Sequence, residues 1–462
     1  MLSLFSYLLD YTTMSSVAYN ADAKNGVVPA PVSPTADYTY ADDDVKSFNS
    51  QLSAGDEKAV GGHGHEERTG SSMGAFFNIV CVIAGTGTLQ LPYSFGQAGW
   101  IGIACVAIAG LFSLFTGHLL IRCLYYKDGE RLSSFSDVGH AAFGKIGKYV
   151  VLVLHYSICL GSACVYINIA GKSVHDLIVH YNVHVHQALW IAIAAILVCL
   201  PFALVKSMKE VAILAVFGAV ATLVMIIVVV VMGLIDLPNH LESEHAVVHW
   251  SMVPVAMGSI CFSFGGNVVY PHTESAMKNP QSWAKVLTMA TIAIVAMYLS
   301  IGIVGYHVYG AAAKSPIYNS LPSSPATTIA ILMLVAHVIL AAPIMLTAFA
   351  LEVEDSYGIT VQRLGKAREF MIRVCFRVAT VVILTIPAML LPVDLLMSLI
   401  GSLSNSLIIF VLPILCYWRL FGIRSMNYAL IAFSILCILI ALMACGYGTY
   451  FAIVGIVAHF SK

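Results

Sequence analysis

The sequence has few charged residues. Only 10% of its 462 residues are Asp, Glu, Lys or Arg, whereas soluble domains carry about 25%. Apolar residues make up 59% of the chain, and its mean hydropathy is +0.87. This composition excludes a water-soluble enzyme. The net charge of −1 and the lack of a basic stripe give no indication of a nucleic-acid partner.

Charged residues are absent from long intervals of the chain. A helix that crosses a lipid bilayer needs about 20 mainly apolar residues. The interval between Arg68 and Arg122 is long enough for two such helices. Further intervals, each suited to one helix, are 148–172, 176–206, 210–236, 244–274, 285–314, 314–352, 377–394, 394–419 and 424–462. The sequence therefore predicts an all-α, multi-pass membrane protein with eleven transmembrane helices.

Basic residues predict the orientation of these helices, because short cytosolic loops are enriched in Lys and Arg. With the N-terminus in the cytosol, only Lys172, Lys314 and Lys462 of the 23 basic residues fall on the opposite side. Residues 1–70 are rich in Ala, Ser, Asp and Gly and show no sustained periodicity. We expect them to form a disordered cytosolic tail, followed by a transmembrane domain over residues 71–460.

Two predicted spans contain glycines near their centres. The first reads Gly85-Thr86-Gly87-Thr88 and the sixth reads Phe264-Gly265-Gly266-Asn267. Main-chain groups that an interrupted helix frees at membrane depth are tolerated where they line a cavity within the protein. We therefore predict that both helices are unwound at these points. The alternative is that these small residues serve only close helix packing.

The positions of the two interruptions favour an inverted repeat. Each interrupted helix is the first of a set of five, and an odd number of helices inserts the second set upside down. Secondary transporters built from such repeats hold their substrate between paired broken helices at the membrane midplane. We predict repeats at about residues 72–236 and 252–418, with an extra helix at about 427–457.

The chemistry of two broken helices predicts the kind of ligand. Free N–H groups at the start of a half-helix suit a carboxylate, and freed carbonyl groups suit an ammonium group. Together they match a zwitterion such as an amino acid, and the lack of a charged residue at either break favours a neutral one. The candidate substrate-binding residues are Ala84, Gly85, Thr86, Gly87, Thr88, Tyr156, Ser263, Phe264, Gly265, Gly266 and Asn267.

Further motifs in these spans resemble those of the amino acid/auxin permease family. They are Gly85-Thr86-Gly87 through Tyr93, Ala98-Gly99-Trp100, Ser134-Phe-Ser-Asp137-Val-Gly139, Gly171-Lys172-Ser173, Phe262 to Asn267, Gly305-Tyr306-His-Val-Tyr-Gly310 and Ser398-Leu-Ile-Gly401. The resemblance covers roughly residues 72–457. It implies a LeuT-like fold of two five-helix repeats plus one helix, and transport of amino acids coupled to an ion gradient. Family members occur at plasma membranes and on vacuoles or vesicles, and both locations stay open.

The eighth span favours protons as the coupled ion. Sodium carriers of this fold bind the ion with hydroxyl groups on helix 8, and between Ala336 and Pro343 this chain has none. Ionisable residues inside a membrane are functional candidates by default, and histidine titrates near neutral pH. We therefore consider His337 and His155 candidates for proton coupling, although each is also compatible with simple helix packing.

Other functions remain as alternatives at this point. The N-terminal tail is compatible with an amino acid sensor that signals through it. The many histidines raise a carrier of metal or other cations, but the breaks contain neither Asp nor Glu, and no metal site is predicted. A membrane-embedded enzyme would need a nucleophile or a His/Asp pair in a polar pocket, and no such spacing occurs. Neither enzymatic activity nor a cofactor is expected.

Overall fold

The structure is a computed structural model that describes residues 70–127, 131–179, 185–205 and 208–461. These residues form helices and connecting segments but no strand, and an isolated bridge joins Gly70 to Met277. The all-α class predicted from the sequence is confirmed. The predicted N-terminal tail, apart from Gly70, lies outside the described residues.

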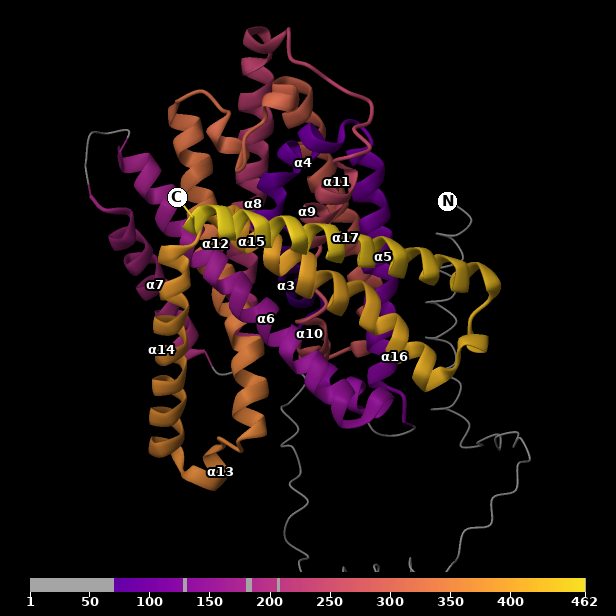
Figure 1. Cartoon of the computed structure of the whole chain (residues 1–462). Coiled ribbons are helices and arrows are strands. Elements are labelled where there is room, and N and C mark those ends of the chain that lie inside the picture. Colours follow the sequence, from indigo (N-terminus) through magenta and orange to yellow (C-terminus); the bar gives the residue numbers. More distant parts are fainter. Residues whose placement is uncertain (1–69, 128–130, 180–184, 206–207, 462) are drawn as a thin grey trace, which may run out of the picture. The chain divides into compact units, whose positions relative to one another are not determined.

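The predicted first repeat, residues 72–236, contains one broken and four long helices (Figure 1). Its elements are α3 (Ser72–Ile83), η1 (Thr86–Gln90), α4 (Leu91–Ala98), α5 (Gly102–Leu124), α6 (Phe135–Val179), α7 (Gln187–Leu204) and α8 (Met208–Asp236), after which η2 (Leu237–His240) follows. A positive φ angle of 66° at Gly144 kinks α6, so its first turns form a separate short helix.

The second set repeats this pattern, with a broken helix first. Its elements are α9 (Val253–Ser263), α10 (Tyr270–Ala276), η3 (Pro280–Ser282), α11 (Trp283–Tyr309), η4 (Gly310–Ala312), η5 (Ile317–Asn319), α12 (Pro325–Ser356), α13 (Val361–Leu364), α14 (Lys366–Leu390), α15 (Val393–Leu399), η6 (Ile400–Val411), α16 (Leu412–Phe421) and η7 (Ile423–Ser425). The segment η6 is a π-helix. The last helix, α17 (Tyr428–Phe460), contacts α9, α15 and η6.

Side-chain caps fix where several of these apolar segments begin. An N-cap side chain satisfies an N–H group that has no partner within the helix. The Ser71 hydroxyl accepts from Gly74 N at 2.9 Å and starts α3. Ser324 does the same for Thr327 N at 3.1 Å, and the Asn427 amide oxygen accepts from Leu430 N at 2.8 Å. These caps set the starts of α3, α12 and α17.

The number of spans is lower than eleven when only long helices are counted. Within the described residues, nine helices are long and apolar enough to cross a membrane, and α3 with α4, which meet at a bend of 41°, bring the number to ten. The predicted sixth span corresponds to α9 and α10, and α9 has only 11 residues. The eleventh crossing therefore stays a prediction.

We call the side at which α3 begins and α12 ends the N-terminal face.

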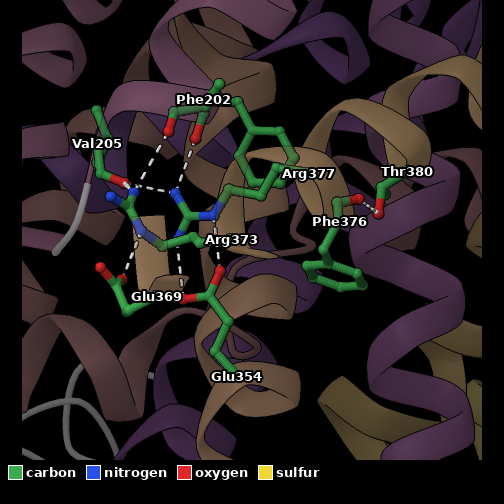
Figure 2. A network of polar contacts seen from close by, with 9 residues as sticks. Phe202, Val205, Glu354, Glu369, Arg373, Phe376, Arg377 and Thr380 are labelled. Atoms are coloured by element: carbon green, nitrogen blue, oxygen red, sulfur yellow. Dashed lines mark hydrogen bonds and ion pairs between the residues drawn. The ribbon is translucent and has the colours of Figure 1, made fainter. Parts of the chain in front are cut away.

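Two buried arginines correct the predicted start of the ninth span. The charge-free interval placed that start after Arg377, whereas α14 begins at Lys366 and contains both Arg373 and Arg377. Figure 2 shows the two guanidinium groups directed toward the end of α7. Arg377 pairs with Glu354 on α12 at 2.7 Å, and Arg373 pairs with Glu369 at 2.8 Å.

The arginines lie there because the end of α7 needs hydrogen-bond donors. The last carbonyl groups of a helix have no partner within it. Arg377 donates to the carbonyl oxygen of Phe202 at 2.7 Å and also to that of Val205, and Arg373 donates to that of Ala203 at 3.3 Å. The network thereby joins the ends of α7 and α12 to α14 with both charges paired.

Candidate functional site

The two broken helices meet at their interruptions. A Cβ atom added to Gly87 would lie 2.4 Å from the Ser263 hydroxyl oxygen and 2.7 Å from Ser263 Cα. A Cβ atom added to Gly266 would lie 2.5 Å from the side chain of Ile83. Each break thus carries a glycine against the other broken helix. Both predicted interruptions are present, and only a residue without a side chain allows this approach.

A small cavity lies at this meeting point. Its volume is about 10 Å³, which is room for roughly one water molecule. Its lining comes from both breaks and from α6, α12 and η6, and consists of Val82, Ile83, Gly87, Ser162, Tyr166, Phe262, Ser263, Gly265, Met345 and Asn405. No lining residue is charged. An amino acid fits there only if the surrounding helices move apart.

Tyr298 on α11 links the two breaks through its hydroxyl group. The hydroxyl oxygen lies 2.6 Å from the carbonyl oxygen of Ile83 and 2.5 Å from that of Ser263. These two acceptors belong to the last residues of α3 and α9, where the helices stop. Because Tyr298 is fully buried, no water can replace its hydroxyl without rearrangement. Tyr298 therefore fixes the relative position of the two breaks.

Asn405 lies at the cavity from the π-helix η6. Its amide nitrogen donates to the carbonyl oxygen of Phe262 at 3.1 Å. Its amide oxygen is buried and has no hydrogen-bond partner within the described residues. π-Helical turns occur frequently at functional sites. Asn405 therefore offers a free acceptor to a ligand in the cavity, and Ser263 adds a hydroxyl group nearby.

His337 on α12 faces the first break. A Cβ atom on Gly85 would lie 3.0 Å from its Nε2 atom and 3.2 Å from the Tyr166 hydroxyl oxygen. Its Nδ1 atom lies 2.7 Å from the Thr222 hydroxyl and 3.1 Å from the carbonyl oxygen of Gly218. A carbonyl oxygen only accepts, so we assign the proton of the neutral ring to Nδ1.

This assignment leaves a lone pair on Nε2, on the side of the break. Within the described residues, Nε2 of His337 is buried without a hydrogen-bond partner. A buried acceptor without a donor is costly, and a proton on this atom would lie beside the carbonyl end of α3. Among the described residues, Nε2 of His337 is thus an unpaired acceptor beside Gly85.

The other predicted residues are distributed around the cavity. Ala84 follows the last residue of α3, Thr88 is buried near Tyr298, and the Phe264 ring stacks edge-to-face on Tyr298 at 5.1 Å. The side chain of Thr86 lies outside what the structure describes. Asn267 points away from the cavity, since its amide nitrogen donates to Thr116 on α5 and to the carbonyl oxygen of Ile409.

Two predicted residues of α6 lie nearer the N-terminal face. Tyr156 stacks on Phe349 at 4.9 Å and does not line the cavity, where Tyr166 lies instead. The reason is that α6 continues to Val179, beyond the charge at Lys172 that ended the predicted span. His155 is buried beside Glu352, with its Nε2 atom 3.8 Å from a carboxylate oxygen, and therefore lies away from His337.

The cavity is closed toward the N-terminal face by contacts around α10. Arg131 pairs with Glu274 at 2.7 Å and donates to the carbonyl oxygen of Pro271 at 2.6 Å. The Tyr125 hydroxyl donates to the same carboxylate at 2.5 Å. Two main-chain hydrogen bonds, of 2.9 and 2.8 Å, join Gly70 to the end of α10.

The opposite face is closed by the segment between η2 and α9. Its main-chain carbonyl groups at Ala246 and Val247 accept from Trp100 and Ile101, in the turn after α4. His245 stacks on Trp100 at 5.9 Å. With these contacts on both faces and a cavity of only about 10 Å³, we interpret the structure as a closed state.

Comparisons with known proteins agree with this architecture. A model of the family described as transmembrane amino acid transporter protein matches residues 68–454. Amino acid transporter AVT1E of Arabidopsis thaliana is 25% identical over 403 residues, which are 85% of this chain and 75% of that protein. The vesicular inhibitory amino acid transporter of Xenopus laevis is 26% identical over 370 residues, 75% of this chain and 70% of that protein.

The fold also matches a solved structure. MhsT in complex with L-phenylalanine aligns with a TM-score of 0.53 and 12% identity, covering 82% of this chain and 100% of that one. This likeness confirms the predicted LeuT-like fold. The resemblance to the amino acid/auxin permeases is confirmed as well, and the chain belongs to the transmembrane amino acid transporter family, as a multi-pass membrane transporter of amino acids and not an enzyme.

Proposed function

We propose that the chain is a secondary active, proton-coupled carrier of neutral amino acids, and that the substrate is held where the two broken helices meet. The observation that supports this most is the cavity between the Gly87–Ser263 and Gly266–Ile83 contacts. Main-chain groups of both breaks border it, and they can bind the two charged ends of an amino acid without a charged side chain.

The cavity offers different partners for each end of the substrate. Within the described residues, the N–H group of Gly87 donates to no main-chain carbonyl, and an N–H group at the start of a half-helix attracts a carboxylate. The free amide oxygen of Asn405 and the carbonyl groups near Phe262 are acceptors for an ammonium group.

The remaining lining favours an uncharged side chain. Val82, Ile83, Phe262 and Met345 are apolar. Burying a charged substrate side chain against them without a partner would cost several kcal/mol. We therefore expect neutral amino acids to be preferred over acidic or basic ones.

His337 is the proposed site of the coupled proton. A proton on its Nε2 atom would place a positive charge beside Gly85, close to where the substrate carboxylate binds. Binding of the proton and of the carboxylate would then strengthen each other by the same factor, as linkage requires. The break needs no metal ion in this scheme, since the imidazolium takes the place of a bound cation.

Transport also requires the closed state to open toward each face in turn. The contacts of Arg131 and Gly70 around α10 form one barrier, and those of Ala246 and Val247 form the other. We propose that the breaks at Gly85 and Gly265 are hinges at which the half-helices move. The N-terminal face is proposed to be cytosolic because Arg131, Lys278 and Arg419 all lie near it, in line with the excess of basic residues in cytosolic loops.

Uptake by reconstituted vesicles tests this proposal. Purified protein is inserted into vesicles, a pH gradient is imposed, and uptake is measured over a panel of radiolabelled amino acids with and without sodium. We expect neutral amino acids to accumulate with the proton gradient, to lose accumulation when a protonophore is added, and to be indifferent to sodium. Accumulation that follows sodium and ignores the pH gradient would contradict proton coupling.

A further inference from the structure

A second pair of titratable groups is buried near the N-terminal face. Glu352 lies close to the end of α12 and His155 lies on α6, and their side chains are 6% and 1% exposed. One carboxylate oxygen of Glu352 accepts from the Ser136 hydroxyl at 2.5 Å. The other oxygen is 3.8 Å from His155 Nε2, beyond hydrogen-bond distance.

This pair leaves hydrogen-bonding groups unused. Within the described residues, the second carboxylate oxygen of Glu352 and both ring nitrogens of His155 are buried without hydrogen-bond partners. Three other buried carboxylates differ, since Arg131, Arg377 and Arg373 pair with Glu274, Glu354 and Glu369. A buried carboxylate that lacks such a cation is strongly disfavoured. One proton, on either member, removes the net charge of the pair.

Few other charges act on the pair. Within the described residues, the titratable groups that interact with Glu352 or with its neighbours are His272 on α10, Arg131 before α6, Asp137, Lys148, Tyr156 and Cys159 on α6, and Tyr357 after α12. Of these, His272 lies on the half-helix that follows the second break. A movement of α10 at that break would therefore change both the charge next to Glu352 and its access to water.

The pair is too far from His337 to belong to the same proton site. His337 and Glu352 lie on one helix, and a helix rises about 1.5 Å per residue, so they are roughly 22 Å apart along its axis. No direct transfer between them is possible. The pair is a separate proton site on α6 and α12, near His272 of the half-helix α10.

We propose that Glu352 and His155 together bind one proton in the closed state, and that they release it to the N-terminal face when α10 moves away. In the loaded pair, a carboxylic acid lies beside a neutral imidazole, or a carboxylate lies beside an imidazolium. Release leaves the carboxylate to be hydrated from the opened face. This inference rests on the proposed proton-coupled transport and adds a second residue pair to it.

The test separates net transport from exchange. Net uptake driven by a pH gradient requires the carrier to load and release its coupled protons, at His337 and at the Glu352–His155 pair, in each cycle. Exchange of labelled for unlabelled amino acid at equal pH on both sides requires only substrate binding and opening toward both sides. For Glu352→Gln, which cannot release a proton at this position, we expect net uptake to fall at least about tenfold while exchange stays within about twofold of the wild type.

The control is Glu369→Gln, a buried carboxylate on the same side of the membrane that Arg373 already pairs. With uptake normalised to reconstituted protein, its ratio of net uptake to exchange should equal that of the wild type. His155→Gln should likewise lose net uptake and keep exchange, and it replaces Glu352→Gln in the test if that variant fails to fold. Glu352→Asp should restore part of the net uptake.

The outcomes distinguish this inference from the proposed function. If wild-type uptake ignores the pH gradient, proton coupling itself is wrong. If the wild type is proton-coupled and both Glu352→Gln and His155→Gln retain net uptake, only the proposed proton site at Glu352 and His155 is wrong. An equal loss of net uptake and exchange in folded Glu352→Gln protein would also contradict it.

Discussion

Replacing Tyr298 by Phe should weaken substrate binding without touching the substrate. The change removes a hydroxyl group that lies 2.6 Å from the carbonyl oxygen of Ile83 and 2.5 Å from that of Ser263. The ring remains, so the cavity wall keeps its shape. A buried acceptor that loses its donor costs about 1–3 kcal/mol, and a difference of about 1.4 kcal/mol is tenfold in an equilibrium constant.

We expect the substrate-bound state to keep both hydrogen bonds from this hydroxyl, so the cost of losing them should fall on that state. We therefore expect the amino acid affinity of Tyr298→Phe to be about 5- to 150-fold lower than that of the wild type. The assay is equilibrium binding of a radiolabelled neutral amino acid to purified protein. Tyr309→Phe is the matched control, because it removes a hydroxyl from the same helix that bonds to Asp236 at 3.0 Å, away from the cavity.

Two results would refute this reasoning. Unchanged affinity in Tyr298→Phe would mean that the hydroxyl does not hold the two breaks in their binding geometry. An equal loss in Tyr309→Phe would mean that any lost hydrogen bond on α11 has the same effect, through stability and not through the site.

Three further variants test other parts of the account. Gly87→Ala places a methyl group 2.4 Å from the Ser263 hydroxyl oxygen. Because such overpacking costs about 1–3 kcal/mol, uptake should fall about 5- to 150-fold. The control Gly258→Ala, whose added Cβ would have its nearest neighbour at 4.0 Å, should transport normally. His337→Gln should retain amino acid exchange but lose the dependence of net uptake on the pH gradient, and retained dependence would refute its role. Arg131→Gln leaves the buried Glu274 carboxylate without its cation, which costs about 3–5 kcal/mol of stability. Thermal unfolding in detergent should show this loss of stability, and the double variant with Glu274→Gln should recover part of it. A double variant no more stable than Arg131→Gln would refute this interpretation of the pair.

The sequence predicted the breaks because their signal is local. Each break is marked by two glycines close together beside Thr or Asn, whereas single glycines such as Gly110 and Gly117 lie within the continuous helix α5, so Gly87 and Gly266 could be identified from the adjacent sequence alone. Neither break contains a charged residue, and the lining of the cavity has none either. Most membrane spans could also be predicted, since lipid requires long apolar runs.

Residues from other helices could not be placed in this way. Tyr166, Tyr298 and Asn405 reach the site because of how α6, α11 and η6 are rotated about their axes, and no local pattern fixes that rotation. Asn405 still left a signal, as an uncharged polar residue in the middle of a span. Asn267 shows the reverse case, because its position beside the break glycines favoured the cavity although its amide group bonds to Thr116 and Ile409.

Charge-free intervals failed where charges are paired inside the protein. Arg373 and Arg377 lie within α14, where Glu369, Glu354 and the end of α7 satisfy them. A count that treats every Arg as a loop residue misplaces such a helix by several turns. Glu352 was overlooked for a related reason, since it only marked the end of an interval and its pairing with His155 depends on the contact between α6 and α12.

The most direct test of the account is equilibrium binding of a radiolabelled neutral amino acid to variants of the two break glycines. Gly85→Leu and Gly266→Leu place side chains against His337 and Ile83, with Cβ distances of 3.0 and 2.5 Å. Gly446→Leu on α17 is the control, because a Cβ atom there meets nothing within 4 Å. We predict that both break variants insert and fold but lose binding, while the control binds like the wild type. Full binding by folded Gly85→Leu and Gly266→Leu proteins would show that the substrate is held elsewhere.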